Sequence, residues 1–403
     1  MQKQKKILFL GGAPSQVPII VEAKSRGFYI ITCDYLPNNP GHKLADEYYN
    51  ISTTDVQSVL KLAEELGPDF IVAYASDPAA PVASYVSEKL NKPGNSYQST
   101  RTLAEKDLFR DFLKHNSFNV PNFISTDKHS YKNLIDKFNL QFPVIVKPND
   151  SSGSKGVSLV DSIDNLTGAV DYSMKFSRSG KVIIEEYIDN SQGDLHGDGF
   201  VLNGKLIFSC LGDHIYNKLS NPFNPCGTLW PSKVSSDLIK KVEAEVNKII
   251  NKSGFSFGPI NIEARINSEG KLFIMEIGPR NGGHYVPQAI KYSTGFDLVK
   301  FYLDVLENKN IEIKNFDYNN YKFVSYFAIH TDHKGIFKDL NISDEIKPFI
   351  KEIFLYMSPG TEVNSFISSN SAVGVVILQF SSRFEMEYFS NNFQKLISVN
   401  LIN

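Results

Sequence analysis

The sequence predicts an α/β fold over its first hundred residues and an α+β fold, with mostly antiparallel sheet, over the rest. Short apolar runs alternate with helix-like segments as far as Leu90, which is the pattern of a parallel sheet with crossover helices. From Phe142 to Ile277, strand-like runs instead follow one another. Among them, Asn203-Gly204 separates two apolar runs, and this dipeptide is a strong signal for a hairpin.

The first part of the chain supplies the parallel sheet and its helices. Strands are expected over Ile7–Leu10, Tyr29–Cys33 and Phe70–Ala73. Amphipathic helices are expected over Val17–Arg26, Val56–Leu66 and Ala79–Leu90. Asp77 is placed to cap the last of these helices. A connecting stretch rich in Ser, Thr and Asn, Asn91–Thr102, leads to a helix over Lys106–His115.

Strands dominate the middle of the chain. They are expected over Val144–Lys147, Val157–Val160, Val182–Glu186, Gly199–Leu202, Lys205–Leu211, Pro259–Ile266 and Leu272–Ile277. Ser236 is placed to cap a helix that runs to Ser253, with apolar residues along one stripe. After Asn308 we expect two more strands, Tyr321–His330 and Val373–Phe380, then a final amphipathic helix, and no residues of evident chemistry.

The composition excludes several classes of protein. The 403 residues hold 42 Lys and Arg against 44 Asp and Glu, and the net charge of -2 gives no reason to expect nucleic acid or an anionic membrane as partner. No apolar stretch approaches the ~20 residues that span a bilayer. Cys33, Cys210 and Cys226 are too scattered for a zinc pair or a disulfide framework. We therefore expect a cytoplasmic protein of about two to four domains.

A glycine turn follows the first strand. Gly11 and Gly12 end that strand, and Asp34 ends the next one, about where a dinucleotide-binding fold places its ribose acid. The residues after Gly12 do not match GxGxxG, whose glycines let pyrophosphate approach a helix N-terminus. A structural turn or a small-ligand pocket is therefore favoured over NAD binding.

A second loop follows a buried strand that ends in Lys147. The residues Ser151–Val157, rich in Gly and Ser, lie between two expected strands and do not match a Walker A loop. Such a loop can form a flap whose backbone N–H groups fold over phosphates. The alternative is a solvated hairpin loop with Lys147 at the surface.

Two acids end the next apolar strand, in the segment Glu185-Glu186-Tyr187-Ile188. This segment could present backbone donors and acceptors to a planar base between apolar side chains. A strand that ends at the protein surface would show the same pattern, so the motif alone leaves both readings open.

The last candidate is a pair of acids on adjacent strands. A tight turn at Asn267–Gly270 would pair these strands antiparallel and bring Glu263 near Glu276. Two carboxylates on apolar strands are costly unless a cation lies between them, and Mg²⁺ shared with nucleotide phosphates fits that place. Arg280 would then stabilise charge on a transferred phosphoryl group. The alternative is a charged hairpin with ordinary ion pairs.

In this order, the motifs resemble the ATP-grasp superfamily. The matching residues are Lys106, Lys147 with its flap, Glu185–Ile188, Glu263, Glu276 and Arg280. The resemblance covers most of the chain and is closest to the carbamoyl phosphate synthetase-like and phosphoribosylglycinamide synthetase-like carboxylate-amine ligases, in the style of L-amino-acid ligases. It implies an ATP-grasp fold with a pre-ATP-grasp domain over 1–100, a catalytic region over 101–308 with a lid at about 120–188, and an α+β subdomain over 309–403.

The resemblance also implies roles for these residues. Lys106 and Lys147 would contact the phosphates of ATP, and Asp194 would bind its ribose, where the family more often has the longer Glu. Glu263 and Glu276 would ligate Mg²⁺ or Mn²⁺. The flap residues that would close over the phosphates are Ser152, Gly153, Ser154 and Gly156. The residues that would hold adenine are Glu185, Glu186, Tyr187 and Ile188.

The implied chemistry is attack of a substrate carboxylate on the γ-phosphate of ATP, followed by attack of an amine on the acylphosphate. Gly278 stands where many members have a metal-binding Asn, but Arg280 is kept, which a passive binder would not need. Two alternatives stay open. One is a synthetase or carboxylase acting on a phosphorylated sugar or nucleotide precursor, and the other is a non-catalytic ATP-binding regulatory module.

Residues near these motifs could meet the organic substrates. His284, with Asn281 and Gly282, could touch the acyl substrate, or His284 could make a structural hydrogen bond. The irregular loop Asn221–Gly227 is a candidate specificity loop, and its Cys226 lacks the paired base that a nucleophile needs. The expected partners are a small-molecule carboxylate and amine, with a homodimer suggested by analogy alone.

Overall fold

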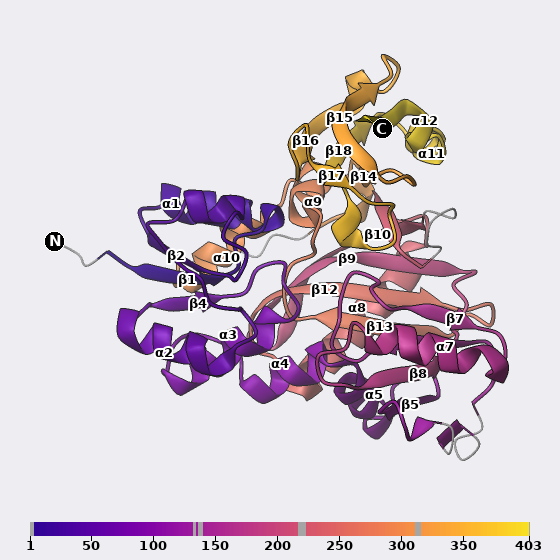
Figure 1. Ribbon diagram of the computed structural model, residues 1–403, viewed down its shortest axis with the longest axis horizontal. Coiled ribbons are helices and arrows are strands. Elements are labelled where there is room, and N and C mark those ends of the chain that lie inside the picture. Colours follow the sequence, from indigo (N-terminus) through magenta and orange to yellow (C-terminus); the bar gives the residue numbers. More distant parts are fainter. Residues whose placement is uncertain are drawn as a thin grey trace.

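The computed structural model describes residues 4–131, 134–135, 140–216, 223–309, 311 and 316–402. Strands in this part of the chain form four sheets, one parallel and the others antiparallel. Figure 1 shows the N-terminal sheet beside a large sheet, with the C-terminal residues above the large one. The predicted combination of α/β and α+β parts is confirmed.

The N-terminal sheet is parallel, in the order β3-β2-β1-β4. Its elements are β1 (Lys6–Leu10), α1 (Val17–Ser25), β2 (Tyr29–Cys33), β3 (Glu47–Tyr49), α2 (Val56–Leu66), β4 (Phe70–Val72) and α3 (Ala79–Lys89). Leu8 and Leu10 of β1 pack toward α2 and α3, whereas Ile7 and Phe9 pack toward α1. This alternation buries both faces of the sheet. The sequence analysis missed β3, a strand of three half-buried residues.

Two expectations about the segments after this sheet are wrong. The stretch Asn91–Thr102 is not a plain connection, because α4 (Tyr97–Ala104) begins inside it and the Ser96 side chain caps that helix. Asp77 does not cap α3 and instead forms an ion pair in the cavity described below. The next helix, α5, has the predicted bounds Lys106–His115.

A small antiparallel sheet follows, in the order β5-β8-β6-β7. Its elements are β5 (Phe123–Thr126), β6 (Val144–Pro148), β7 (Ser158–Val160), α7 (Ile163–Met174) and β8 (Val182–Glu186). Leu166 and Val170 of α7 pack on Val144 and Val182, so the helix covers one face of the sheet. The other face is turned toward the large sheet (Figure 1).

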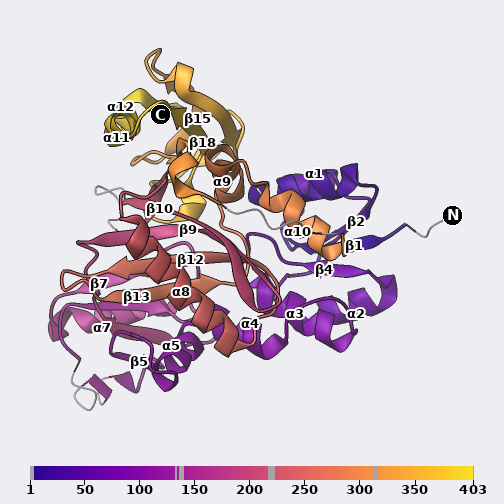
Figure 2. The ribbon, with the colours of Figure 1, turned by 180° about the vertical axis from the view of Figure 1, so that it is seen from behind.

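The large sheet has eight strands in the order β13-β12-β9-β10-β11-β14-β18-β16. These are β9 (Gly193–Leu202), β10 (Lys205–Tyr216), β11 (Pro225–Trp230), β12 (Gly258–Ile266), β13 (Leu272–Gly278), β14 (Phe323–Ile329), β16 (Ile350–Leu355) and β18 (Gly374–Phe380). The hairpin predicted at Asn203-Gly204 joins β9 to β10 and is confirmed. Behind the sheet lies α8 (Ser236–Ser253), which Figure 2 shows across β9 and β12.

The last hundred residues complete structures that began earlier in the chain. Their elements outside the large sheet are β15 (Gly335–Ile342), β17 (Glu362–Val363), α11 (Arg383–Asn391), α12 (Phe393–Leu396) and β19 (Ile397–Ile402), preceded by α9 (Val286–Thr294) and α10 (Leu298–Leu306). The helix predicted at the end is α11, but the chain continues into β19, which pairs with β15. Leu303 and Leu306 of α10 pack on Ile7 and Phe9 of the N-terminal sheet, on the same face as α1. None of the described helices is both long enough and apolar enough to cross a membrane.

Candidate active site

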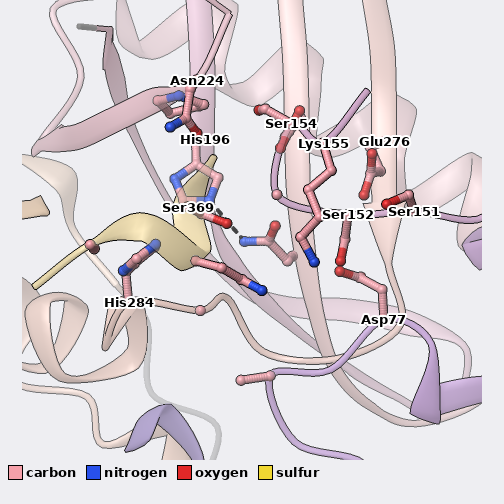
Figure 3. Close-up of a pocket in the computed structure, with 18 of the residues that line it drawn as sticks. Asp77, Ser151, Ser152, Ser154, Lys155, His196, Asn224, Glu276, His284 and Ser369 are labelled. Atoms are coloured by element: carbon pink, nitrogen blue, oxygen red, sulfur yellow. Dashed lines mark hydrogen bonds between the residues drawn. The ribbon is translucent and has the colours of Figure 1, made fainter. Parts of the chain in front are cut away.

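A cavity of about 700 Å³ lies where the parallel sheet, the small sheet and the large sheet meet. The parallel sheet contributes loops that follow its strands: Ala13–Ser15 after β1, Asn38–Pro40 after β2 and Asp77 after β4. These loops lie at the carboxyl edge of the strands, where open parallel sheets bind ligands. The small sheet contributes the flap, which Figure 3 shows through Ser152, Ser154 and Lys155 on the same side of the cavity as Glu276.

The glycine turn after β1 is a structural turn at the edge of this cavity. A Cβ on Gly41 would lie 2.9 Å from the Cα of Gly12, so the two loops can approach only because both residues are glycines. Asp34 orders the second loop, since its carboxylate accepts hydrogen bonds from the backbone of Leu36 and, at 2.8 Å, from the side chain of Asn39. Its carboxylate is thereby committed to the loop.

Lys147 is held by a buried cluster of three charges. Its Nζ lies 2.5 Å from Glu185 Oε1, and Arg110 donates to both oxygens of the same carboxylate, at 2.9 and 3.4 Å. Burial alone would raise the pKa of Glu185, but the Arg110 and Lys147 charges outweigh it and hold that pKa at about 2. Arg110 also donates to the Met275 carbonyl, which ties the cluster to β13.

The flap residues take backbone conformations that favour glycine. Gly153, Ser154 and Gly156 all have positive φ. Lys106 Nζ donates to the Ser151 carbonyl at 2.8 Å, so a predicted phosphate contact sits at the base of the flap. At the tip, Ser154 Oγ donates to the Phe223 carbonyl, and a Cβ on Gly153 would lie 2.1 Å from Ser369 Oγ. The flap is therefore closed against the segment just before β11 and against the C-terminal residues.

Glu263 and Glu276 are paired across β12 and β13, as the tight turn at Asn267–Gly270 predicts. Burial and the neighbouring Glu276 charge raise the pKa of Glu263, so a cation beside the pair would offset the cost of its charged form. Lys106 Nζ is 4.0 Å from Glu276. The described residues contain no cluster of three or more metal-ligating side chains. Two carboxylates suit a hard ion such as Mg²⁺, whose other ligands are commonly phosphate oxygens and water.

Arg280 forms a bidentate ion pair with Asp77. Its Nε and one terminal nitrogen each lie 2.6 Å from a carboxylate oxygen, and the other terminal nitrogen donates to the Asn281 carbonyl. These bonds use three of the five N–H donors of a guanidinium, which leaves two for an anion in the cavity. A Cβ on Gly278 would lie 3.0 Å from Asp77 Oδ1 and 3.2 Å from Arg280 Cζ, so the missing Asn side chain would crowd this pair.

Asp194 lies in a dense polar network. Its carboxylate accepts from Asn190 at 2.6 Å and from the Tyr216 hydroxyl at 2.7 Å, and Arg265 is 3.8 Å away. Burial opposes ionisation, but hydrogen bonds and charges from His214, Arg265 and Asn190 lower the Asp194 pKa. The group is an anion that lines the cavity, as a ribose acceptor would need to be.

The residues after Arg280 form a turn that is hydrogen-bonded to a buried carboxylate. Asn281 and Gly282 donate to the buried carboxylate of Asp198, whose pKa burial raises to about 6 despite these bonds. His284 lines the cavity across from Glu276 (Figure 3) and shares a 3.1 Å hydrogen bond with the Tyr356 hydroxyl. Burial lowers the pKa of His284 to about 4, so its ring is neutral at pH 7. Cys226 is buried, and desolvation raises its thiol pKa to about 12.

Comparisons with known proteins agree with this geometry. A family model described as "ATP-grasp domain" matches residues 140–288. A formate-dependent phosphoribosylglycinamide formyltransferase from Prochlorococcus marinus (strain MIT 9515) is 30% identical over 287 residues, which are 69% of this chain and 70% of that relative. The chain belongs to the ATP-grasp superfamily. As an ATP-grasp protein it is an ADP-forming ligase that makes C–N bonds, as the motifs predict.

Solved structures share the ATP-grasp fold. An L-amino acid ligase from Bacillus licheniformis superposes with a TM-score of 0.81 at 19% identity, over 100% of both chains. An N5-carboxyaminoimidazole synthetase from Staphylococcus aureus, complexed with ADP, gives 0.75 at 16% identity over 97% of both chains. At these identities the likeness establishes the fold alone. Dependence on ATP and Mg²⁺ is established for the superfamily as a whole.

The cavity gathers many of the predicted ATP-grasp residues but not all. Those in its lining are Lys106, Lys147, Ser152, Gly153, Ser154, Glu185, Asp194, Glu263, Glu276, Arg280 and His284. Those outside the lining are Gly156, Glu186, Tyr187, Ile188, Asn281, Gly282 and Cys226. Asn221 and Pro222 of the predicted specificity loop lie outside the described residues. The sequence analysis did not single out Asp77, Arg110, Lys155 or Asn224 as site residues. Lys155, inside the flap motif, and Asn224, inside the predicted specificity loop, had signals that could have found them.

Proposed function

We propose that the protein is an ATP-dependent carboxylate-amine ligase that activates its carboxylate substrate as an acylphosphate. The observation that carries this proposal is the convergence, in one cavity beneath a closed flap, of two lysines, a pair of carboxylates and a buried arginine. The members of this set are Lys106, Lys147, Glu263, Glu276 and Arg280. The set matches the needs of phosphoryl transfer, which depends on positioning and charge neutralisation.

ATP would lie between the small sheet and the large sheet. Lys147, fixed by Glu185, would contact the phosphates together with Lys106 and the flap. Adenine would lie at Glu185–Ile188, of which Glu185 is in the cavity lining, while the backbone N–H groups of Glu186 and Tyr187 already donate to Asn122 and Pro143. Asp194 would accept a ribose hydroxyl. The small sheet (Phe123–Glu186) then corresponds to a lid within the proposed boundaries 120–188, in a catalytic region over 101–308 between the N-terminal domain and the C-terminal subdomain.

Glu263 and Glu276 would hold Mg²⁺, or Mn²⁺ in its place, against the terminal phosphates. When bound, such an ion neutralises charge on the transferred group. Gly278 contributes no metal ligand. Its lack of a side chain instead makes room for the Asp77–Arg280 pair.

The substrate carboxylate oxygen would attack the γ-phosphorus, and the bond from that phosphorus to the ADP oxygen would break. Arg280 would direct its two remaining N–H donors at the charge that develops on the transferred group. An amine would then attack the acyl carbon, form the C–N bond and release phosphate, while the flap keeps water from the acylphosphate.

A phosphorylated substrate finds little support in the described part of the cavity. Five basic side chains line it, and five acidic ones balance them. Arg280, Lys147 and Arg265 each have a carboxylate within 4.0 Å, and ATP would take Lys106, so Lys155 of the flap is what remains of the basic side chains in the described lining. A single lysine is not a cluster of cations for a second phosphate, so we propose substrates without a phosphate group.

The test is Mg-ATP-dependent phosphate release from pooled carboxylic acids and pooled amines, supplied singly and together. We expect release that requires both pools, retention with Mn²⁺, and loss in Glu276→Ala. The matched control is Glu269→Ala, an exposed acid in the turn of the same hairpin, which should release phosphate at the wild-type rate. Release that needs neither pool, or that survives in Glu276→Ala, would overturn the proposal. Light scattering of the same preparation tests the proposed homodimer.

A further inference from the structure

The Asn224 side chain is buried in the cavity wall and has no hydrogen-bond partner in the described part of the chain. It is the residue before β11, lines the cavity and has 0% of its surface exposed. Neither its Oδ1 nor its Nδ2 has a partner among the described residues. Burying a polar group without a partner is costly, and nearly all such groups in folded proteins find one. When both the donor and the acceptor of a primary amide lack partners at the wall of a cavity, the arrangement points to a ligand that supplies both hydrogen bonds.

The flap closes onto the same segment. Ser154 Oγ donates to the carbonyl of Phe223, the residue next to Asn224, at 3.0 Å. Closure therefore encloses the Asn224 amide together with whatever occupies this end of the cavity. Without an occupant, closure leaves an acceptor and a donor unsatisfied, and a bound group that satisfies both makes closure more favourable.

The side chains at this end of the cavity are uncharged and flat. Burial lowers the pKa of His284 to about 4, so its ring is neutral at pH 7. The buried ring of His196 shares hydrogen bonds with Thr228 and Asn261 through its two nitrogens. Tyr326 and Tyr356 complete the wall, with Tyr326 stacked on His284 at 6.1 Å between ring centroids. Figure 3 places Asn224, His196 and His284 around the same space. A charged group placed among these rings would lose hydration, whereas a neutral polar group loses less.

We propose that Asn224 recognises a neutral amide-type group, a primary carboxamide or a peptide unit, on one organic substrate of the ligase. The Asn224 Oδ1 accepts from the N–H of that group, and its Nδ2 donates to the carbonyl oxygen. The aromatic wall receives a planar apolar substituent next to the amide. That the bound group belongs to a substrate rests on the proposed function, but binding at Asn224 can be tested without turnover.

The first experiment measures the melting temperature of the full chain with added benzamide, benzoate or acetamide. Benzamide carries the donor, the acceptor and a flat ring, benzoate lacks the N–H donor, and acetamide lacks the ring. We expect benzamide to raise the melting temperature, acetamide to do so only at concentrations at least about tenfold higher, and benzoate to have no effect. In Asn224→Leu we expect benzamide binding to weaken at least about tenfold, with the shift given by Mg-ADP unchanged. Asn341→Leu, an exposed Asn on β15 outside the cavity, is the matched control.

A second variant covers the case in which Asn224→Leu does not fold. Asn224→Asp keeps an acceptor and replaces the donor by a negative charge, so we expect it to prefer benzamidine over benzamide, reversing the wild-type order. Equal benzamide binding in wild type and variants, or no benzamide binding by the wild type, overturns the inference. Failure of the proposed function is seen separately, as the absence of phosphate release by the wild type.

Discussion

Replacing Asp77 by Asn removes the charge that holds Arg280 while keeping the size of the side chain. The wild-type pair has two contacts of 2.6 Å, and the two side chains are only 10% and 19% exposed. Removing one partner of a buried, hydrogen-bonded charge pair costs about 2–5 kcal/mol. If about 3 kcal/mol of this is lost from the transition state, phosphate release falls by about 10²-fold.

The assay is a double-mutant cycle on phosphate release with Asp77→Asn, Arg280→Lys and the double variant. Lysine keeps the charge of Arg280 but cannot make the bidentate contact. If Asp77 acts only by holding the guanidinium, the double variant loses no more than Arg280→Lys alone. Losses that multiply would refute this reasoning and assign Asp77 an independent contact with substrate. Asp171→Asn, which removes one side of an exposed ion pair on α7, is the control expected to have no effect.

Three further predictions concern neighbouring residues. Burial already lowers the Lys147 pKa against the opposing Glu185 charge, and Glu185→Gln removes that opposition and lowers the pKa further. ATP binding measured by calorimetry should therefore weaken about tenfold in Glu185→Gln, and weaken more steeply than in wild type from pH 7 to 9. Gly278→Asn should lower phosphate release at least about tenfold by displacing the Asp77–Arg280 pair, and wild-type rates would contradict the crowding argument. The pKa of His284 is about 4 in the folded chain and ~6.5 in the unfolded chain, so the unfolded chain takes up a proton at a higher pH than the folded one. The free energy of unfolding is therefore highest above pH 6.5 and falls as the pH drops toward 4. Between pH 7 and pH 5, the free energy of unfolding of His284→Phe should fall by about 2 kcal/mol less than that of wild type, seen as a smaller drop in melting temperature.

The sequence was sufficient for elements with strong local patterns. The strand that ends in Lys147 and the hairpin of Glu263 and Glu276 are where the apolar runs and the turn residues place them. The strands β15 and β19 were missed because their residues are largely half-buried, so apolar and polar positions do not alternate cleanly. Local pattern also failed for Asp77, since its position suits a helix cap as well as it suits a distant ion pair.

Side chains whose role depends on distant partners could not be found from the sequence. Arg110 lies on a helix that looks ordinary, and only the fold brings it to Glu185, 75 positions away. Asp77 and Arg280 are 203 positions apart. For Asn224 the informative property is a missing partner, which no sequence pattern records. The candidate site was thus predictable as a set of motifs, whereas the contacts that fix their geometry were not.

The order of strands in the large sheet affects folding of the chain during its synthesis. β11 (Pro225–Trp230) pairs with β14 (Phe323–Ile329), and β18 and β16 extend the sheet beyond β14. During synthesis, β11 leaves the ribosome about a hundred residues before its neighbour, at roughly 5–20 residues per second. For those seconds its unpaired backbone edge is open to other chains. A chaperone that covers this edge at the ribosome, or faster synthesis of the C-terminal strands, would therefore raise the yield of folded protein. The gain would be larger than for a protein whose neighbouring strands follow each other in the chain.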